Sequence, residues 1–280
     1  MSEPTPTLSV TLLGSGGPLP EPDRAGPGTL VAVGERRFLF DCGRGVVMRS
    51  AAAGTAPNQL TAVLLTHLHS DHVSAFGDVV TTRWIATFAP APLAVIGPPG
   101  TATLVDDTLR LLAPDVGWRM EHHDDLTWEP ECTVTEVDDG VAYDDDEVRI
   151  LAAPTDHRPV RPTVGYRLEA GGRAVVVAGD TVPCEGLDRL CEGADVYVQT
   201  VIRRDLIEAI PLPRLQDVLD YHSTVEDAAV TAARAGVGTL VLTHQVPPPQ
   251  PGTEDEWIGL ATAHFDGEVL FGRDLLTVER

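Results

Sequence analysis

Apolar residues along the chain fall in short runs that turn residues separate, which is typical of alternating strands and helices. Runs rich in Val, Leu and Ile predict β-strands over 8–13, 29–33, 38–40, 62–66, 93–96, 133–137, 148–152, 164–168, 174–178, 196–198, 239–242, 268–271 and 275–278. Helical spacing of apolar residues predicts helices over 46–53, 73–88, 101–112, 187–191 and 225–235, with Pro114 ending the third of these.

The order of these elements predicts the architecture. Strands come first, strands then alternate with helices, and the same pattern recurs in the second half of the chain. This order favours an α/β (α+β) fold in which two sheets pack face to face and helices cover both outer faces, a four-layer αββα sandwich. We expect residues 1–280 to form a single domain of this kind.

Composition and charge narrow the function. The chain has 280 residues and 43% apolar content, enough for an extensive core. All 20 basic residues are arginine, and the 42 acidic residues give a net charge of −22, which disfavours nucleic acid and anionic membranes. Four scattered cysteines, no signal-like segment over 1–7 and no long apolar stretch lead us to expect a cytoplasmic location and no membrane partner.

The strongest chemical signal is the sequence THLHSDH at 66–72, where a predicted buried strand ends. Alternate residues at a strand end face the same way, so His67 and His69 can share one ion. The turn that follows directs Asp71 and His72 elsewhere, towards a second ion. Imidazole and carboxylate ligands suit Zn²⁺, and also Mn²⁺ or Fe²⁺.

Three more potential metal ligands closely follow other predicted strands. His157 comes after the strand 148–152, Asp180 after 174–178 and His244 after 239–242. A single histidine is more often structural than functional. Three such residues in equivalent positions indicate that one edge of a sheet presents them to a shared site.

The whole pattern resembles the metallo-β-lactamase fold superfamily. It includes the glycine-rich turn LLGSGG at 12–17 with Arg24, the sequence DCG at 41–43 and the sequence YHST at 221–224. The first and the last of these resemble the ribonuclease Z and arylsulfatase branch. In that branch the histidine matching His222 lies beside the metals and assists the leaving group.

The resemblance implies the role of each site residue. One metal ion would bind His67, His69 and His157, and the other would bind Asp71, His72 and His244. Asp180 would bridge the two ions beside a bridging hydroxide, which attacks the substrate. We expect Asp71 and His222 to take part in catalysis, although the segment after His222 also fits a helix N-cap.

Two features depart from ribonuclease Z. Gln199 and Thr200 occupy the positions of the family's His-Glu pair, so His222 lacks its carboxylate partner unless Asp205 or Glu208 supplies one. The family's tRNA-grasping arm would lie between His157 and Asp180, but only 23 positions separate them.

We therefore expect a hydrolase that uses two divalent metal ions, most simply zinc, to cleave an ester-type bond in a small-molecule substrate. Phosphodiesters or sulfate esters are favoured, and a nucleic acid substrate is not expected. Lactone or thioester hydrolysis, tRNA 3′-processing endoribonuclease activity and an iron-dependent oxidoreductase of the same fold remain alternatives.

Specificity is expected to come from the segment 199–222, which combines apolar residues and prolines with polar groups near the site. Within it, Gln199, Arg203 and Arg204 are candidates for substrate binding. The resemblance also implies a homodimer.

Overall fold

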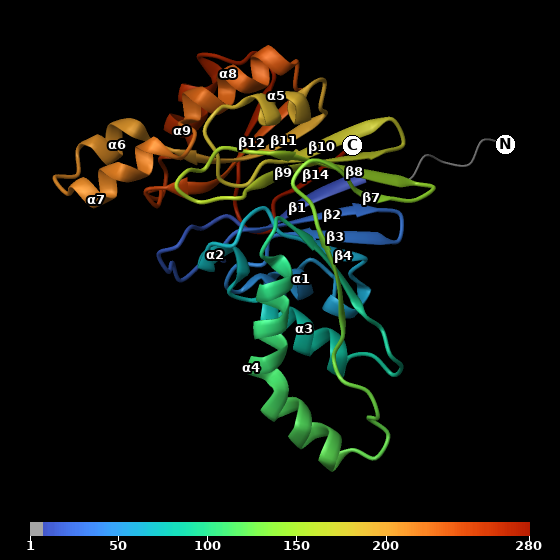
Figure 1. The fold of residues 1–280 in the computed structure, drawn as a ribbon. Helices are drawn as coiled ribbons and strands as arrows, with labels where there is room; N and C mark the ends of the chain where they lie inside the picture. The colour runs from blue at the N-terminus through green and yellow to red at the C-terminus, as the bar shows by residue number, and fades with distance from the viewer. Residues whose placement is uncertain (1–7) are drawn as a thin grey trace.

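The computed structural model describes residues 8–280, and in it two stacked β-sheets carry helices on both outer faces (Figure 1). The expectation about the segment 1–7 lies outside these residues. One sheet has the strand order β14-β1-β2-β3-β4-β5-β6, and the other has the order β13-β12-β11-β10-β9-β8-β7. This arrangement confirms the predicted αββα sandwich.

The first sheet comes from the amino-terminal half of the chain and one strand from the carboxyl terminus. Its strands are β1 (Leu8–Gly14), β2 (Gly28–Val33), β3 (Arg36–Phe40), β4 (Ala62–Leu64), β5 (Leu93–Gly97), β6 (Cys132–Glu136) and β14 (Thr277–Glu279). The helical segments on this side are α1 (Val46–Ala52), η1 (Pro57–Gln59), α2 (Ser70–Val73), α3 (Phe76–Ile85) and α4 (Thr101–His122).

The second sheet and its helices come from the other half. Its strands are β7 (Gly140–Asp144), β8 (Val148–Pro154), β9 (Val164–Ala170), β10 (Arg173–Val177), β11 (Val196–Ile202), β12 (Thr239–Val246) and β13 (Glu268–Phe271). Its helical segments are α5 (Glu185–Cys191), α6 (Arg204–Glu208), α7 (Pro213–Gln216), η2 (Asp217–Asp220), α8 (Val225–Ala235) and α9 (Glu254–Thr262). Figure 1 shows α5, α8 and α9 on the outer face of this sheet, and α6 and α7 projecting from one end of it.

Side chains alternate between the two faces of each strand, and the buried ones form three layers of core. On β10, Val175 and Val177 face the other sheet, whereas Ala174 and Val176 pack with the apolar residues of α5, α8 and α9. Successive side chains of a strand point to opposite faces, so one strand can supply both layers. Burying each large apolar side chain contributes about 1.5–3 kcal/mol, which makes these layers the main source of stability.

Two predicted helices have clearly different bounds. The helix expected over 73–88 is α3, which spans only Phe76–Ile85. The helix expected to stop before Pro114 is α4, which continues through Pro114 to His122. Proline cannot donate a hydrogen bond to the carbonyl of Arg110. Figure 1 shows that α4 projects from the body. Pro114 is exposed, so water can satisfy that carbonyl instead.

Among residues 8–280, no helix is both long enough and apolar enough to cross a membrane.

Candidate metal centre

The ends of several strands place the predicted ligands at one end of the sandwich. His67 and His69 follow β4, and the short helix α2 carries Asp71 and His72. His157 follows β8, Asp180 follows β10, and β12 contains His244. β10, β11 and β12 run parallel to one another, and β8 runs in the same direction as β10 because both are antiparallel to β9. The carboxyl ends of these strands therefore lie at the same edge of their sheet.

The side chains converge on the carboxylate of Asp180, which is almost fully buried. Five imidazole Nε2 atoms lie near its Oδ2 atom: those of His72 and His222 at 3.4 Å, His67 and His244 at 3.8 Å, and His157 at 3.9 Å. Two groups of ligand atoms, each within 4.8 Å of one another, are His67, His69, His157 and Asp180, and Asp71, His72 and His244. The structure thus brings together all seven predicted ligands, with His222 beside them.

Several buried polar atoms of this cluster lack a hydrogen-bond partner among residues 8–280. They are Nε2 of His67 and His72, Oδ1 of Asp180 and Nδ1 of His244. Leaving a buried polar atom unpaired costs about 1–3 kcal/mol. A cation between the rings would satisfy the first three of these atoms, whereas His244 faces the centre with its other nitrogen, Nε2. Nitrogen and carboxylate donors are those that divalent transition metals prefer. The cluster therefore fits divalent metal ions.

Hydrogen bonds on the far side of the rings set their orientation. Asp41 Oδ2 accepts from His72 Nδ1 at 2.8 Å, and the backbone N–H and the hydroxyl of Thr66 each donate to the same carboxylate at 2.8 Å. The backbone carbonyl of Tyr221 accepts from His157 Nδ1 at 2.8 Å. Both contacts leave the Nε2 atom directed at the centre, as expected for a metal ligand.

Asp41 was missing from the predicted site. The signal that found the other ligands applies to it as well, because Asp41 is the first polar residue after the strand Arg36–Phe40.

His222 is held by the backbone rather than by a carboxylate. Its Nδ1 atom donates to the carbonyl of Val218 in η2 at 2.9 Å, and Nε2 faces Asp180. Asp205 and Glu208, the residues considered as its partner, pair instead with Arg203 and Arg204. A main-chain carbonyl, that of Val218, therefore takes the place of the carboxylate partner that the resemblance implied for His222.

The protonation states of His157, His67 and Asp180 suit metal binding. Burial lowers the pKa of the His157 imidazole to about 4 and that of His67 well below its usual value, which favours the neutral ligand form. Burial alone would raise the pKa of Asp180, but His244 and His72 hold it well below its usual range. The carboxylate is therefore ionised.

The three residues predicted to bind substrate do not hydrogen-bond to the cluster. Gln199 is fully buried, accepts from the Tyr197 hydroxyl at 2.6 Å and donates to the Thr200 carbonyl at 2.7 Å. Arg203 is buried over the ring of Trp257 and pairs with Asp205 at 2.7 Å. Arg204 pairs with Glu208 on the surface. Their role in substrate binding stays a prediction.

Gly179 allows the close approach that places Asp180. Its φ angle is +68°, and a Cβ atom there would lie 2.6 Å from Thr66 Oγ1. We expect Gly179→Ala to lower the free energy of unfolding by about 2–4 kcal/mol, since it combines backbone strain with a clash. Urea denaturation measures this. Gly193→Ala is the matched control because φ is +61° there but nothing lies within 4 Å, and an equal loss in both variants would contradict the role of the contact.

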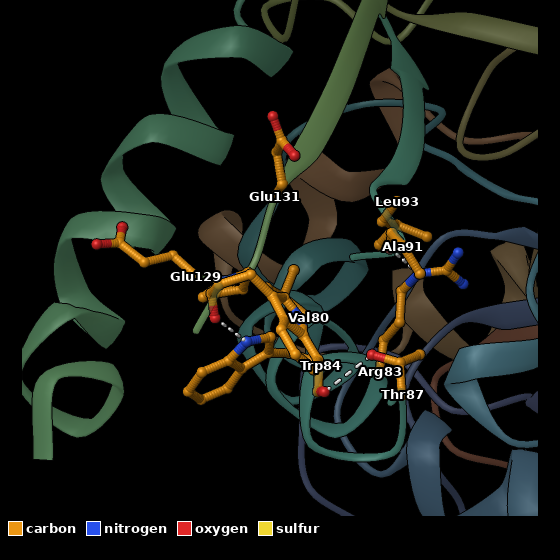
Figure 2. Close-up of a pocket in the computed structure, with 10 residues that line it drawn as sticks. Val80, Arg83, Trp84, Thr87, Ala91, Leu93, Glu129 and Glu131 are labelled. Carbon is orange, nitrogen blue, oxygen red and sulfur yellow. Dashed lines mark hydrogen bonds between the residues drawn. The ribbon is translucent and has the colours of Figure 1, made fainter. Parts of the chain in front are cut away.

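Two hollows flank different parts of the molecule. Figure 2 shows one lined by Val80, Arg83 and Trp84 of α3 and by Glu129, where the Trp84 indole donates to the Trp128 carbonyl at 2.9 Å. Its volume of about 10 Å³ holds no more than a water molecule. The other, of about 370 Å³, contains Asp71 and is lined by Pro18, Arg44, Ser70 and Asp78. Of these two hollows, only the second is lined by a predicted ligand.

Comparison with known proteins places this geometry in a family. A β-lactamase superfamily domain model matches residues 36–245. A ribonuclease Z from Mycolicibacterium gilvum (strain PYR-GCK) is 57% identical over 274 residues, covering 97% of this chain and 96% of the relative. A ribonuclease Z from Mycobacterium tuberculosis (strain ATCC 25618 / H37Rv) is 55% identical over 274 residues, covering 97% and 98%.

Solved structures share the fold. The metallo-β-lactamase fold protein YhfI from Bacillus subtilis superposes with a TM-score of 0.74 at 22% identity, covering 98% of this chain and 100% of that protein. The short form of human tRNase Z superposes with a TM-score of 0.70 at 22% identity, covering 96% and 98%.

These relatives overturn the expected partners. The expectation of a small-molecule substrate and the expectation against nucleic acid were wrong, because proteins more than half identical over nearly the whole chain are ribonucleases. Net charge misled here since it sums over the whole surface and says nothing of the local field around one site. The chain is a metal-dependent hydrolase acting on ester bonds, and it belongs to the ribonuclease Z family of the β-lactamase superfamily.

Proposed function

We propose that this protein is a tRNA 3′-processing endoribonuclease that cleaves a phosphodiester bond at the histidine and aspartate cluster. The observation that carries the proposal is the likeness to ribonuclease Z at 55–57% identity over 97% of the chain. The intact cluster around Asp180 supports it, because an inactive relative would have little reason to keep every ligand. The comparisons favour this alternative over hydrolysis of a small phosphate or sulfate ester.

The cluster would hold two ions, for which zinc is our proposal. His67, His69 and His157 would bind one, Asp71, His72 and His244 the other, and Asp180 both. When bound, such ions activate water at neutral pH and stabilise the charge that develops on phosphate oxygens.

Residues of the chain itself orient the reacting groups. Asp41 holds the His72 ring so that Nε2 faces the centre. The Val218 carbonyl does the same for His222, whose Nε2 atom is then in place to donate to the leaving oxygen. Asp71 lies in the open hollow, at the boundary between the cluster and the substrate.

The segment 199–222 remains our proposal for the part of this single domain, 1–280, that sets specificity. It contains α6 and α7, which project from the end of the sandwich (Figure 1), and the short helix η2. In this segment the carbonyl of Val218 orients His222, and the carbonyl of Tyr221 orients His157. A substrate that contacts the segment therefore also contacts the residues that orient these two histidines.

The test uses a precursor tRNA with a 3′ trailer. We expect the purified enzyme to release the trailer, to lose this activity after treatment with EDTA and to regain it when zinc or manganese is added, because the ligands cannot supply the charge of the ions. Gel analysis of end-labelled RNA measures cleavage, and mass spectrometry measures bound metal.

Two results would contradict the proposal. An enzyme with its full metal content that hydrolyses bis(p-nitrophenyl) phosphate but leaves precursor tRNA intact would exclude tRNA processing. Bound iron with visible absorption bands would instead favour the oxidoreductase alternative.

A further inference from the structure

Most arginines of this acidic protein are already paired with acids. Of the 20 arginines, 15 have a carboxylate oxygen within 4.0 Å. A paired guanidinium must give up or share its partner before it can bind a phosphate. Such residues therefore add little to the attraction of RNA.

Five arginines have no such pair within residues 8–280: Arg37, Arg44, Arg83, Arg161 and Arg214. Arg83 donates to four backbone carbonyls, and Arg37 donates to the carbonyls of Gly34 and Arg36. Arg44 donates only through Nη2, to the carbonyls of Gly17 and Pro18. Arg161 and Arg214 make no side-chain hydrogen bond in the described part of the chain, and all three of these last arginines are exposed.

Arg44 lies at the rim of the open hollow. It lines that hollow together with Asp71, one of the predicted ligands. Arg44 donates to the carbonyl of Gly17. Gly17 lies next to His244, because a Cβ atom on Gly17 would lie 3.1 Å from the His244 ring.

Arg161 lies in the short loop that carries His157. Two backbone hydrogen bonds close this loop, from Val160 to the His157 carbonyl at 3.0 Å and from Thr155 to the Thr163 carbonyl at 3.0 Å. A phosphate bound to Arg161 would therefore be held by the same short loop that carries His157, one of the candidate metal ligands.

Arg214 lies on α7, directly before η2. The carbonyl of Val218 in η2 orients His222. Figure 1 shows α6 and α7 at the same end of the sandwich as α2, which carries Asp71 and His72.

We propose that Arg44, Arg161 and Arg214 bind backbone phosphates of the RNA near the metal centre. The inference rests on the proposed function, and it identifies the groups that let a chain of net charge −22 hold a polyanion. Because no carboxylate oxygen within residues 8–280 lies within 4.0 Å of any of the three, each can release a counterion from the RNA on binding. The three lie on separate segments, so together they would fix the direction in which the strand enters the site.

The experiment compares wild type, the three single variants Arg44→Gln, Arg161→Gln and Arg214→Gln, and the triple variant. We expect each single change to reduce kcat/KM for precursor tRNA about fivefold at 0.1 M salt, and the triple change to reduce it about a hundredfold. The loss should appear in KM. The slope of log(kcat/KM) against log salt should fall by about 0.7–0.9 for each arginine removed.

Arg37→Gln is the matched control. Arg37 also lacks a carboxylate partner within residues 8–280. It lies near the start of β3, at the end of that strand opposite to the one that leads to Asp41 and the cluster. We expect this variant to match wild type in both kcat/KM and salt slope.

The outcomes separate this inference from the proposed function. A wild-type enzyme that does not cleave precursor tRNA would overturn the proposed function and this inference with it. If wild type cleaves and the triple variant has the same KM and salt slope, only this inference fails. An equal loss on bis(p-nitrophenyl) phosphate would show damage to the metal centre and would also overturn it. If the triple variant does not fold, the single variants decide the question by the same criteria.

Discussion

Replacing Asp180 with alanine is expected to remove bound metal and hydrolytic activity together. Its Oδ2 atom lies within 3.9 Å of five imidazole nitrogens, and the carboxylate neighbours both groups of candidate ligands. Without it, buried histidines would surround the cations with no carboxylate between the two groups. We expect kcat/KM to fall by about 10⁴ or more, since both activation of water and stabilisation of charge depend on the metals.

Metal analysis of the purified variants measures the first effect, and cleavage of precursor tRNA measures the second. Asp180→Asn keeps the shape of the side chain and should bind metal more weakly than wild type, with the fold retained. Asp266→Ala serves as the control, because Asp266 is an exposed acid that belongs to neither ligand group and does not line the hollow. An Asp180→Ala enzyme with the metal content of wild type would contradict the bridging role.

The layers of the fold and the convergence of the candidate ligands could be predicted because both depend on local patterns. Alternation on β10 identifies its two buried faces, and polar residues at or just after the carboxyl ends of β8, β10 and β12 identify one edge. The same rule applies to Asp41, but only the structure shows its bond to His72.

The rest could not be predicted because it depends on contacts between distant segments. The carbonyls of Val218 and Tyr221 orient two histidines, and a backbone carbonyl carries no side-chain signal in a sequence. The short helices α6 and α7 lie in a stretch rich in prolines, where periodicity has too few residues to be read. The net charge was a poor guide to the partner, because the sequence does not reveal which arginines are paired.

Replacing His222 with alanine is expected to leave the metal content unchanged and to reduce turnover of precursor tRNA about 10²- to 10⁴-fold. His222 belongs to neither group of candidate ligands, so the ions keep their donors. Its Nδ1 proton is engaged by Val218, and Nε2 is the atom that can donate to the leaving oxygen. The measurement is kcat under saturating substrate, together with metal content. His264→Ala is the control, because that histidine is exposed and outside the cluster.

Comparing two leaving groups then tests how His222 acts. The p-nitrophenolate group of bis(p-nitrophenyl) phosphate departs without help from an acid, whereas the oxygen released from RNA needs a proton. If His222 is a general acid, the alanine variant should lose far more activity on RNA than on the nitrophenyl ester. Equal losses on both substrates would instead indicate that His222 stabilises charge in the transition state. Full turnover of RNA by a metal-replete His222→Ala enzyme would exclude both roles.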